Sequence, residues 1–201
     1  MKFLATMCLC LVALGMTSCG RGVMFPHYYT LDVPPAPGRM ACAPRIPGTA
    51  VIYRFQTPSY LRQGRIVYRE SPEEIGFYDY HRWAADPADA VTRAMIDALR
   101  SSELFSFVKP YDGHNQEDYL MVGRLERLEE IDYGGRVRVE AKISAELVNA
   151  RTGATEWTGN ATETVAIESR NLNSVVSAMD LALQKSIAAL VASMDQRFIA
   201  N

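Results

Sequence analysis

Residues 136–147 read RVRVEAKISAEL and alternate strictly between polar and apolar side chains. The odd positions from Val137 to Leu147 are apolar, whereas the even positions from Arg136 to Glu146 are charged or Ser. Successive side chains of a β-strand point to opposite faces of the sheet. A strand with one buried face and one solvated face is typical of antiparallel sheets. This stretch therefore predicts a long strand that packs on a core along one side only.

The segments on either side of this strand predict its neighbours in the sheet. Residues 119–129 precede a Gly-Gly turn, and residues 155–167 alternate again after a turn at Gly153. Short connections that contain glycine join antiparallel neighbours. Residues 119–167 are therefore expected to form a three-stranded antiparallel meander.

A first helix is expected to begin at Asp86-Pro87. Asp is a favourable N-cap residue, and Pro suits the first helical position. Apolar side chains recur at helical spacing from Val91 to Leu99, and the serine pair at 101–102 ends the pattern. The spacing predicts a helix with one apolar face.

A second helix is expected near the C-terminus, capped by Asn173 or Ser174 and carrying an apolar stripe from Val176 to Met194. A helix this apolar packs against another element, and the buried face of the sheet is its partner. Shorter strands are expected at residues 28–31, 49–55, 63–68, 75–80 and 104–108. The expected fold class is α+β, with a largely antiparallel mixed sheet and two main helices packed on one face.

Residues 1–18 have the pattern of a bacterial lipoprotein signal peptide. Lys2 precedes fourteen uncharged, mainly apolar residues at 3–16, and a Thr-Ser pair then leads to Cys19. This run suits a signal sequence, because a membrane-spanning helix needs roughly 20 residues. The pattern resembles the lipobox, in which Cys19 would become the site of lipid attachment.

The expected organisation is a signal peptide at residues 1–18, acylated Cys19 with a tether at 19–27, and a single domain at 28–201. One acyl chain binds a membrane only marginally, so several chains on one cysteine would make a durable anchor. Gly20 follows Cys19, and by resemblance to enterobacterial sorting this favours the outer membrane, facing the periplasm. The remaining Cys42 is interpreted as a small, half-buried residue rather than a nucleophile.

The sequence contains no motif for catalysis, metal binding or nucleotide binding. His27, His81 and His114 have no metal-ligand spacing, and neither a phosphate-binding loop nor a nucleophile elbow occurs. The side chains of the adjacent Glu129 and Glu130 are expected to point in opposite directions and to be solvated. A net charge of -2 argues against nucleic acid as a partner. We therefore expect neither an enzyme nor a cofactor or metal.

The segment YDYHRW at residues 78–83 is the candidate contact surface. Tyr78 and Tyr80 would lie on one side of a strand, and Arg82 adds a guanidinium group. Aromatic residues and Arg are enriched at protein interfaces. Trp83 is instead expected in the core, where it would anchor the first helix against the sheet.

The runs IVYRESP at 66–72 and YDYHRW at 78–83, followed by Pro87, resemble the ABC-type transport auxiliary lipoproteins, a group that includes paraquat-inducible protein C. The sequence YYTL at 28–31 and the Thr-Gly turn before Trp157 also fit this family. The motif residues, which are expected to be structural, are Tyr68, Arg69, Trp83 and Pro87.

The resemblance implies a non-enzymatic component of an envelope transport system. Such systems include an ABC permease, an ATPase and a mammalian-cell-entry (MCE) domain protein that forms rings or tubes, and their cargo is lipid or another hydrophobic molecule. The lipoprotein would dock with the MCE component as a homo-oligomer, in its simplest form a ring. Two alternatives stay open: a structural or assembly lipoprotein of the outer membrane, and a periplasmic lipid-binding carrier.

Overall fold

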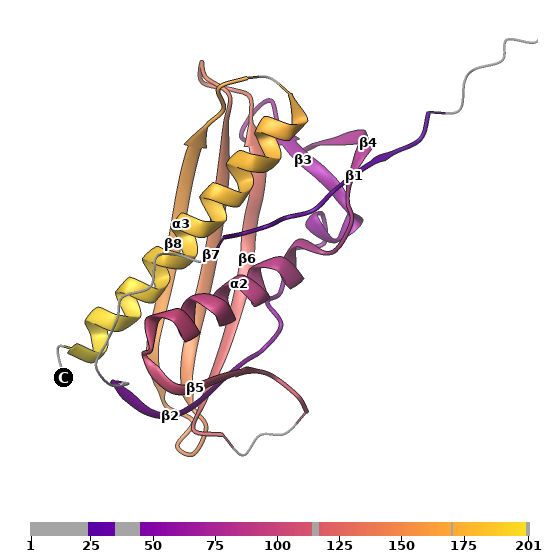
Figure 1. Ribbon diagram of the computed structural model, residues 1–201. Helices are drawn as coiled ribbons and strands as arrows, with labels where there is room; N and C mark the ends of the chain where they lie inside the picture. The colour runs from indigo at the N-terminus through magenta and orange to yellow at the C-terminus, as the bar shows by residue number, and fades with distance from the viewer. Residues whose placement is uncertain (1–23, 35–44, 114–116, 170, 200–201) are drawn as a thin grey trace, which may run out of the picture.

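A three-stranded antiparallel meander lies at the centre of the computed structural model (Figure 1). Its strands are β6 (Tyr119–Ile131), β7 (Arg138–Asn149) and β8 (Thr155–Ala166). β7 pairs with both neighbours in antiparallel register, as the alternation in the sequence predicts. The structure describes residues 24–34, 45–113, 117–169 and 171–199.

Among the described residues, five shorter strands continue the sheet from the other edge of β6 in two groups. In the first group, β2 (Ile46–Ile52) runs parallel to the start of β6 and to β5 (Phe105–Pro110). In the second, β3 (Arg65–Arg69) runs parallel to the end of β6 and antiparallel to β4 (Gly76–Trp83), and β1 (His27–Tyr29) runs parallel to β4. The long β6 strand therefore joins both groups to the meander.

The short strands occur where the sequence predicts them, but their bounds differ. β3 and β4 form an antiparallel hairpin. β2 begins three residues earlier than expected and ends at Ile52. The early start follows from a partner distant in sequence, because Ile46 pairs with Phe105 of β5.

Two helices, α2 (Pro87–Ser102) and α3 (Leu172–Ile199), cover one face of the sheet (Figure 1). The Asp86 side chain caps α2 as expected, because its Oδ1 accepts a hydrogen bond from the backbone N–H of Ala88 at 2.9 Å. A largely antiparallel mixed sheet with two helices on one face confirms the α+β fold class.

The N-terminus of α3 differs from the expectation. The capping side chain is Asn171, whose Oδ1 accepts a hydrogen bond from the backbone N–H of Ser174 at 2.9 Å, so neither Asn173 nor Ser174 is the cap. By length and composition α3 could cross a membrane, but half of its most apolar window is buried in the protein. It packs on β7 and β8 as a core helix.

The apolar side chains of the meander and the helices form one core. Val139, Ile143 and Leu147 of β7 are fully buried, as the alternation requires. Each such side chain contributes roughly 1.5–3 kcal/mol through removal from water. From α3, the core receives Met179, Leu183 and Ile187. Burial of one sheet face under α3 therefore stabilises the fold.

A charge placed on the buried face should unfold the domain. Ile143→Asp would bury an unpaired carboxylate, so we expect the cooperative unfolding transition to be lost or strongly lowered. Thr162→Asp introduces the same charge on the exposed face, beside Lys142 in the register, and should change the free energy of unfolding by less than about 0.5 kcal/mol. Urea denaturation followed by circular dichroism measures both. Equal losses of stability in the two variants would refute a sheet with one buried and one exposed face.

Candidate functional site

A β-bulge in β6 determines where its carboxylates point. Two residues, Glu126 and Arg127, lie opposite the single Lys142 of β7, because the register shifts between Leu125 and Arg127. Beyond the bulge, Glu129 pairs with a residue of the outer face, and its neighbour points toward the helices. Two charged β6 residues on the outer face form cross-strand ion pairs, Glu126–Lys142 at 2.7 Å and Arg127–Glu140 at 2.8 Å.

Glu129 and Glu130 point apart, as expected, but the expected solvated face is wrong. Their exposed fractions are 0% and 7%. A buried carboxylate needs charged or hydrogen-bonding partners, because removal from water penalises the ionised form. Each glutamate receives such partners from segments distant in sequence.

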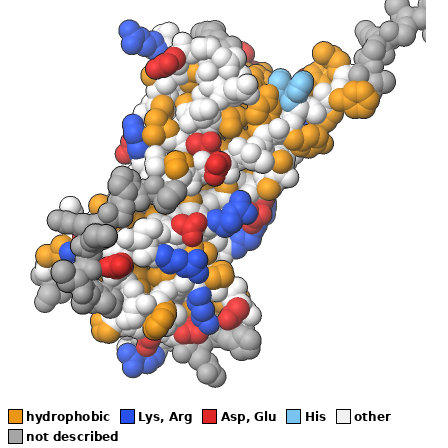
Figure 2. Space-filling model, in the orientation of Figure 1, with side chains coloured by type: hydrophobic (Ala, Val, Ile, Leu, Met, Phe, Trp, Pro, Cys, Tyr) orange, Lys and Arg blue, Asp and Glu red, His pale blue; other side chains and the backbone are white. Residues whose placement is uncertain are grey.

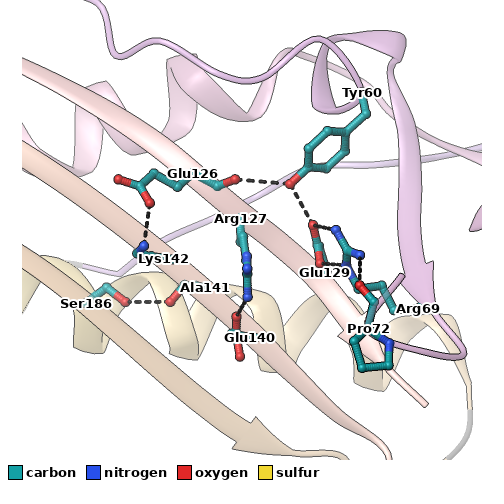
Figure 3. A network of polar contacts seen from close by, with 10 residues as sticks. All are labelled: Tyr60, Arg69, Pro72, Glu126, Arg127, Glu129, Glu140, Ala141, Lys142 and Ser186. Atoms are coloured by element: carbon teal, nitrogen blue, oxygen red, sulfur yellow. Dashed lines mark hydrogen bonds and ion pairs between the residues drawn. The ribbon is translucent and has the colours of Figure 1, made fainter. Parts of the chain in front are cut away.

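Glu129 is the centre of a buried polar network (Figure 3). Tyr60 donates its hydroxyl hydrogen to Glu129 Oε1 at 2.6 Å, and Arg69 binds both carboxylate oxygens through Nε and Nη2. Arg69 also donates from Nη1 to the carbonyl oxygen of Pro72 at 2.9 Å. The network therefore fixes the strand β3 and the β3–β4 turn to β6.

The network shifts the acidities of its members. Burial raises the pKa of Tyr60, and the hydrogen bond to Glu129 raises it further. The hydrogen bond to Glu129 also raises the pKa of Arg69. Tyr60 therefore stays a neutral donor and Arg69 a cation, which suits a structural pair and not proton transfer at neutral pH.

The four motif residues, Tyr68, Arg69, Trp83 and Pro87, make structural contacts in or next to the second strand group. Arg69 belongs to the Glu129 network, and Tyr68 packs so closely on Gly76 that a Cβ there would lie 2.2 Å from the ring. Trp83 is 5% exposed and lies in the core. Pro87 is buried in the first turn of α2.

Tyr78 has a different environment from the one the sequence suggests. Its hydroxyl donates to Glu130 Oε2 at 2.7 Å, and its ring lies 5.0 Å from that of Tyr68. Burial raises the pKa of Tyr78, and Glu130 adds to the shift. Tyr78 thus compensates a buried carboxylate, so its removal would lower stability as well as any binding.

Tyr80 and Arg82 lie on the outer edge formed by β1 and β4. Tyr80 is 45% exposed, and Arg82 is partly exposed beside Tyr28, which is 63% exposed. Figure 2 shows hydrophobic side chains gathered with histidine over this part of the molecule. We name Tyr28, Tyr80 and Arg82 the β1–β4 edge.

Two histidines meet behind this edge, which the sequence did not indicate. The rings of His27 and His81 stack with centroids 5.4 Å apart, and the Tyr29 hydroxyl lies 3.0 Å from His81 Nδ1. Burial lowers the pKa of His81, and the neighbouring His27 lowers it further. Within the described ranges, no group of three His, Cys, Asp or Glu side chains could hold a metal ion. His114, Cys19 and Cys42 lie outside the described residues.

Sequence reasoning missed Tyr60 and the burial of both glutamates. The available signal is the position of Glu129 and Glu130 between the apolar Leu128 and Ile131, all four of which are buried. Adjacent charges inside such a run indicate buried pairs. The partners themselves lie 60 or more residues away from Glu129, beyond the reach of local patterns.

The comparisons with known proteins agree on family and fold. A family model described as ABC-type transport auxiliary lipoprotein component matches residues 29–196. Similar solved structures include a protein from Xanthomonas campestris, with 18% identity and a TM-score of 0.72 over 85% of this chain and 98% of that chain. An uncharacterized protein has 13% identity and a TM-score of 0.65 over 85% and 99% of the two chains. No curated protein matches the chain.

Loss of the guanidinium group should destabilise the domain far more at Arg69 than at an exposed ion pair. Arg69→Met leaves the buried Glu129 without its cation, and we expect the free energy of unfolding to fall by about 3–5 kcal/mol. Arg127→Met makes the same change in the exposed pair with Glu140 and should cost less than about 1 kcal/mol. Urea titration of both variants measures the difference. Similar small losses would show that the Glu129 network is not a stabilising pair.

Proposed function

The chain belongs to the ABC-type transport auxiliary lipoprotein family, and from this premise we propose that it is a membrane-anchored, non-enzymatic component of an envelope transport system. The observation that carries the proposal is the extent of the family match, which covers residues 29–196 and so almost all of the folded domain. The system would contain an ABC permease, an ATPase and an MCE-domain protein, with lipid or another hydrophobic molecule as cargo.

Anchoring is proposed at Cys19, after removal of residues 1–18. Residues 19–27 would form the acylated tether, and residues 28–201 the single domain. Lipid on Cys19 would hold the domain on the periplasmic face of the outer membrane. The first described strand begins at His27, the last residue of the expected tether, so the tether would lead directly into the β1–β4 edge.

Docking to the MCE-domain component is proposed at the β1–β4 edge. Exposed aromatic side chains beside a guanidinium group are the usual anchors of protein interfaces. Tyr80 and Arg82 keep the role that their sequence suggests, and Tyr28 joins them through the pairing of β1 with β4. A ring-shaped homo-oligomer would present several copies of this edge to a ring-shaped partner.

A non-enzymatic role is supported by the side-chain partners that already hold the buried carboxylates. The buried carboxylates of Glu129 and Glu130 are held by Arg69, Tyr60 and Tyr78 in structural contacts. A general base would instead need access to a substrate proton.

Replacement of Cys19 tests the anchor. Cys19→Ser removes the thiol that would accept the lipid, so cells labelled with radioactive palmitate should yield no labelled protein and an uncleaved precursor. Cys42→Ser removes the other cysteine downstream of the signal and should be labelled like wild type. Wild-type labelling of Cys19→Ser would exclude this cysteine as the anchor.

Truncation of the β1–β4 edge tests docking. The Tyr80→Ala/Arg82→Ala double variant should bind the MCE-domain protein of the same cell at least about thirtyfold more weakly, because interface anchors typically contribute about 2 kcal/mol or more. Its melting temperature should stay close to wild type, since Tyr80 is exposed. Trp83→Ala should instead lose about 3–5 kcal/mol of stability, because it empties a core position. Wild-type affinity of the double variant would place the docking surface elsewhere.

A further inference from the structure

Two adjoining cavities lie beside the segment that links β2 to β3. The first, of about 530 Å³, is lined by residues that include Arg54, Gln56, Arg62 and Arg124. The second, of about 670 Å³, shares Arg54, Gln56 and Arg124 and continues over the outer face of β6 and β7 to Lys142. Volumes of this size are typical of small-ligand sites. The boundary between the two cavities is therefore basic.

The charges around the first cavity are not fully balanced. Arg54 binds Asp86 at 2.8 Å and Asp89 at 2.6 Å. Neither Arg62 nor Arg124 forms an ion pair or side-chain hydrogen bond within the described part of the chain. In the second cavity, Glu126 is held by Lys142 at 2.7 Å, and this bond lowers the pKa of Glu126. The charge of Arg124 contributes to the same shift, but neither Arg62 nor Arg124 has a hydrogen-bonded counterion among the residues that the structure describes, so both guanidinium groups remain available to an anion.

A buried hydroxyl adds an independent indication of a ligand. Thr57 lines the same cavity, is 7% exposed, and its Oγ1 has no hydrogen-bond partner among the described residues. Buried polar groups are nearly always paired, so an unpaired hydroxyl at a cavity requires an explanation. Oγ1 is itself shielded from solvent, so the Thr57 side chain must rotate to bring its hydrogen to an oxygen atom of a bound ligand. Gln56 and Ser59 supply further polar groups at the rim.

The backbone around these side chains is held firmly. Gln56 donates its N–H to the carbonyl oxygen of Gly123 at 2.9 Å and accepts from Leu125 at 2.9 Å, which places Gln56 beside Arg124. A turn from Pro58 to Leu61, closed by a 3.1 Å hydrogen bond, precedes Arg62. The cavity is therefore built on strand β6 and a hydrogen-bonded turn, which keeps its polar groups in place.

We propose that the first cavity binds a phosphate group through Arg62, Arg124 and Thr57. The planar guanidinium group pairs with two oxygens of a phosphate, and a phosphate has enough oxygens to accept from two arginines and a hydroxyl together. The phosphate comes either from a phospholipid headgroup or from free phosphate. The headgroup source rests on the proposed transport function, since it would make the site a contact for the cargo.

Calorimetric titration of the mature acylated chain in a nonionic detergent tests this site. The probes are inorganic phosphate and dihexanoyl phosphatidylglycerol below its micelle concentration. Wild type should bind at least one probe, and Arg62→Gln/Arg124→Gln should bind it at least about tenfold more weakly. Arg136→Gln/Arg151→Gln removes two exposed charges away from the cavity and should bind like wild type. Thr57→Val should also weaken binding while the fold, checked by melting temperature, persists.

The affinities for the two probes distinguish a phospholipid headgroup from free phosphate and show whether the site exists. Lipid binding at least about tenfold tighter than phosphate supports the headgroup, whereas equal binding supports free phosphate. No binding of either probe, or equal losses in both double variants, overturns the proposal. Palmitate labelling and binding to the MCE-domain protein do not require Arg62 or Arg124, so the proposed function can hold when this site fails.

Discussion

The buried contact of Glu129 with Arg69 and Tyr60 supports the part of the molecule that carries the outer edge. β3 meets β6 through only two paired positions, Tyr68 with Glu130 and Arg69 with Ile131. So short a parallel ladder stabilises little by itself, and the side-chain network adds charged hydrogen bonds between the same strands. β4 pairs with β3, and β1 pairs with β4. The position of the whole edge therefore follows from this contact.

Local patterns in the sequence were enough to predict the meander and α2. The strict alternation at 136–147 specifies which face of β7 is buried, and Asp86-Pro87 specifies where α2 begins. The buried glutamates could not be found in the same way. Their burial depends on the bulge at Glu126 and on partners from distant segments, and an alternating pattern reveals neither.

The candidate surface was predictable in composition but not in geometry. Tyr80 and Arg82 stand out in the sequence as aromatic and basic, whereas the burial of the Tyr78 hydroxyl against Glu130 depends on the pairing of β3 with β6. The parallel pairing of β1 with β4 brings His27 to His81 and Tyr28 to Arg82. A three-residue strand has too little pattern to reveal such a partner. The proposed anchor at Cys19, in contrast, depends on sequence alone.

Amide hydrogen exchange of Glu129→Gln tests the central role of the Glu129 network most directly, with Glu140→Gln as the control in an exposed ion pair. We expect Glu129→Gln to speed exchange in residues 65–83, which span β3 and β4, while α3 and the centre of β7 keep their protection. Glu140→Gln should leave both regions unchanged. Wild-type protection at 65–83 in Glu129→Gln, or an equal loss of protection across the whole domain, would contradict the central role of the Glu129 network.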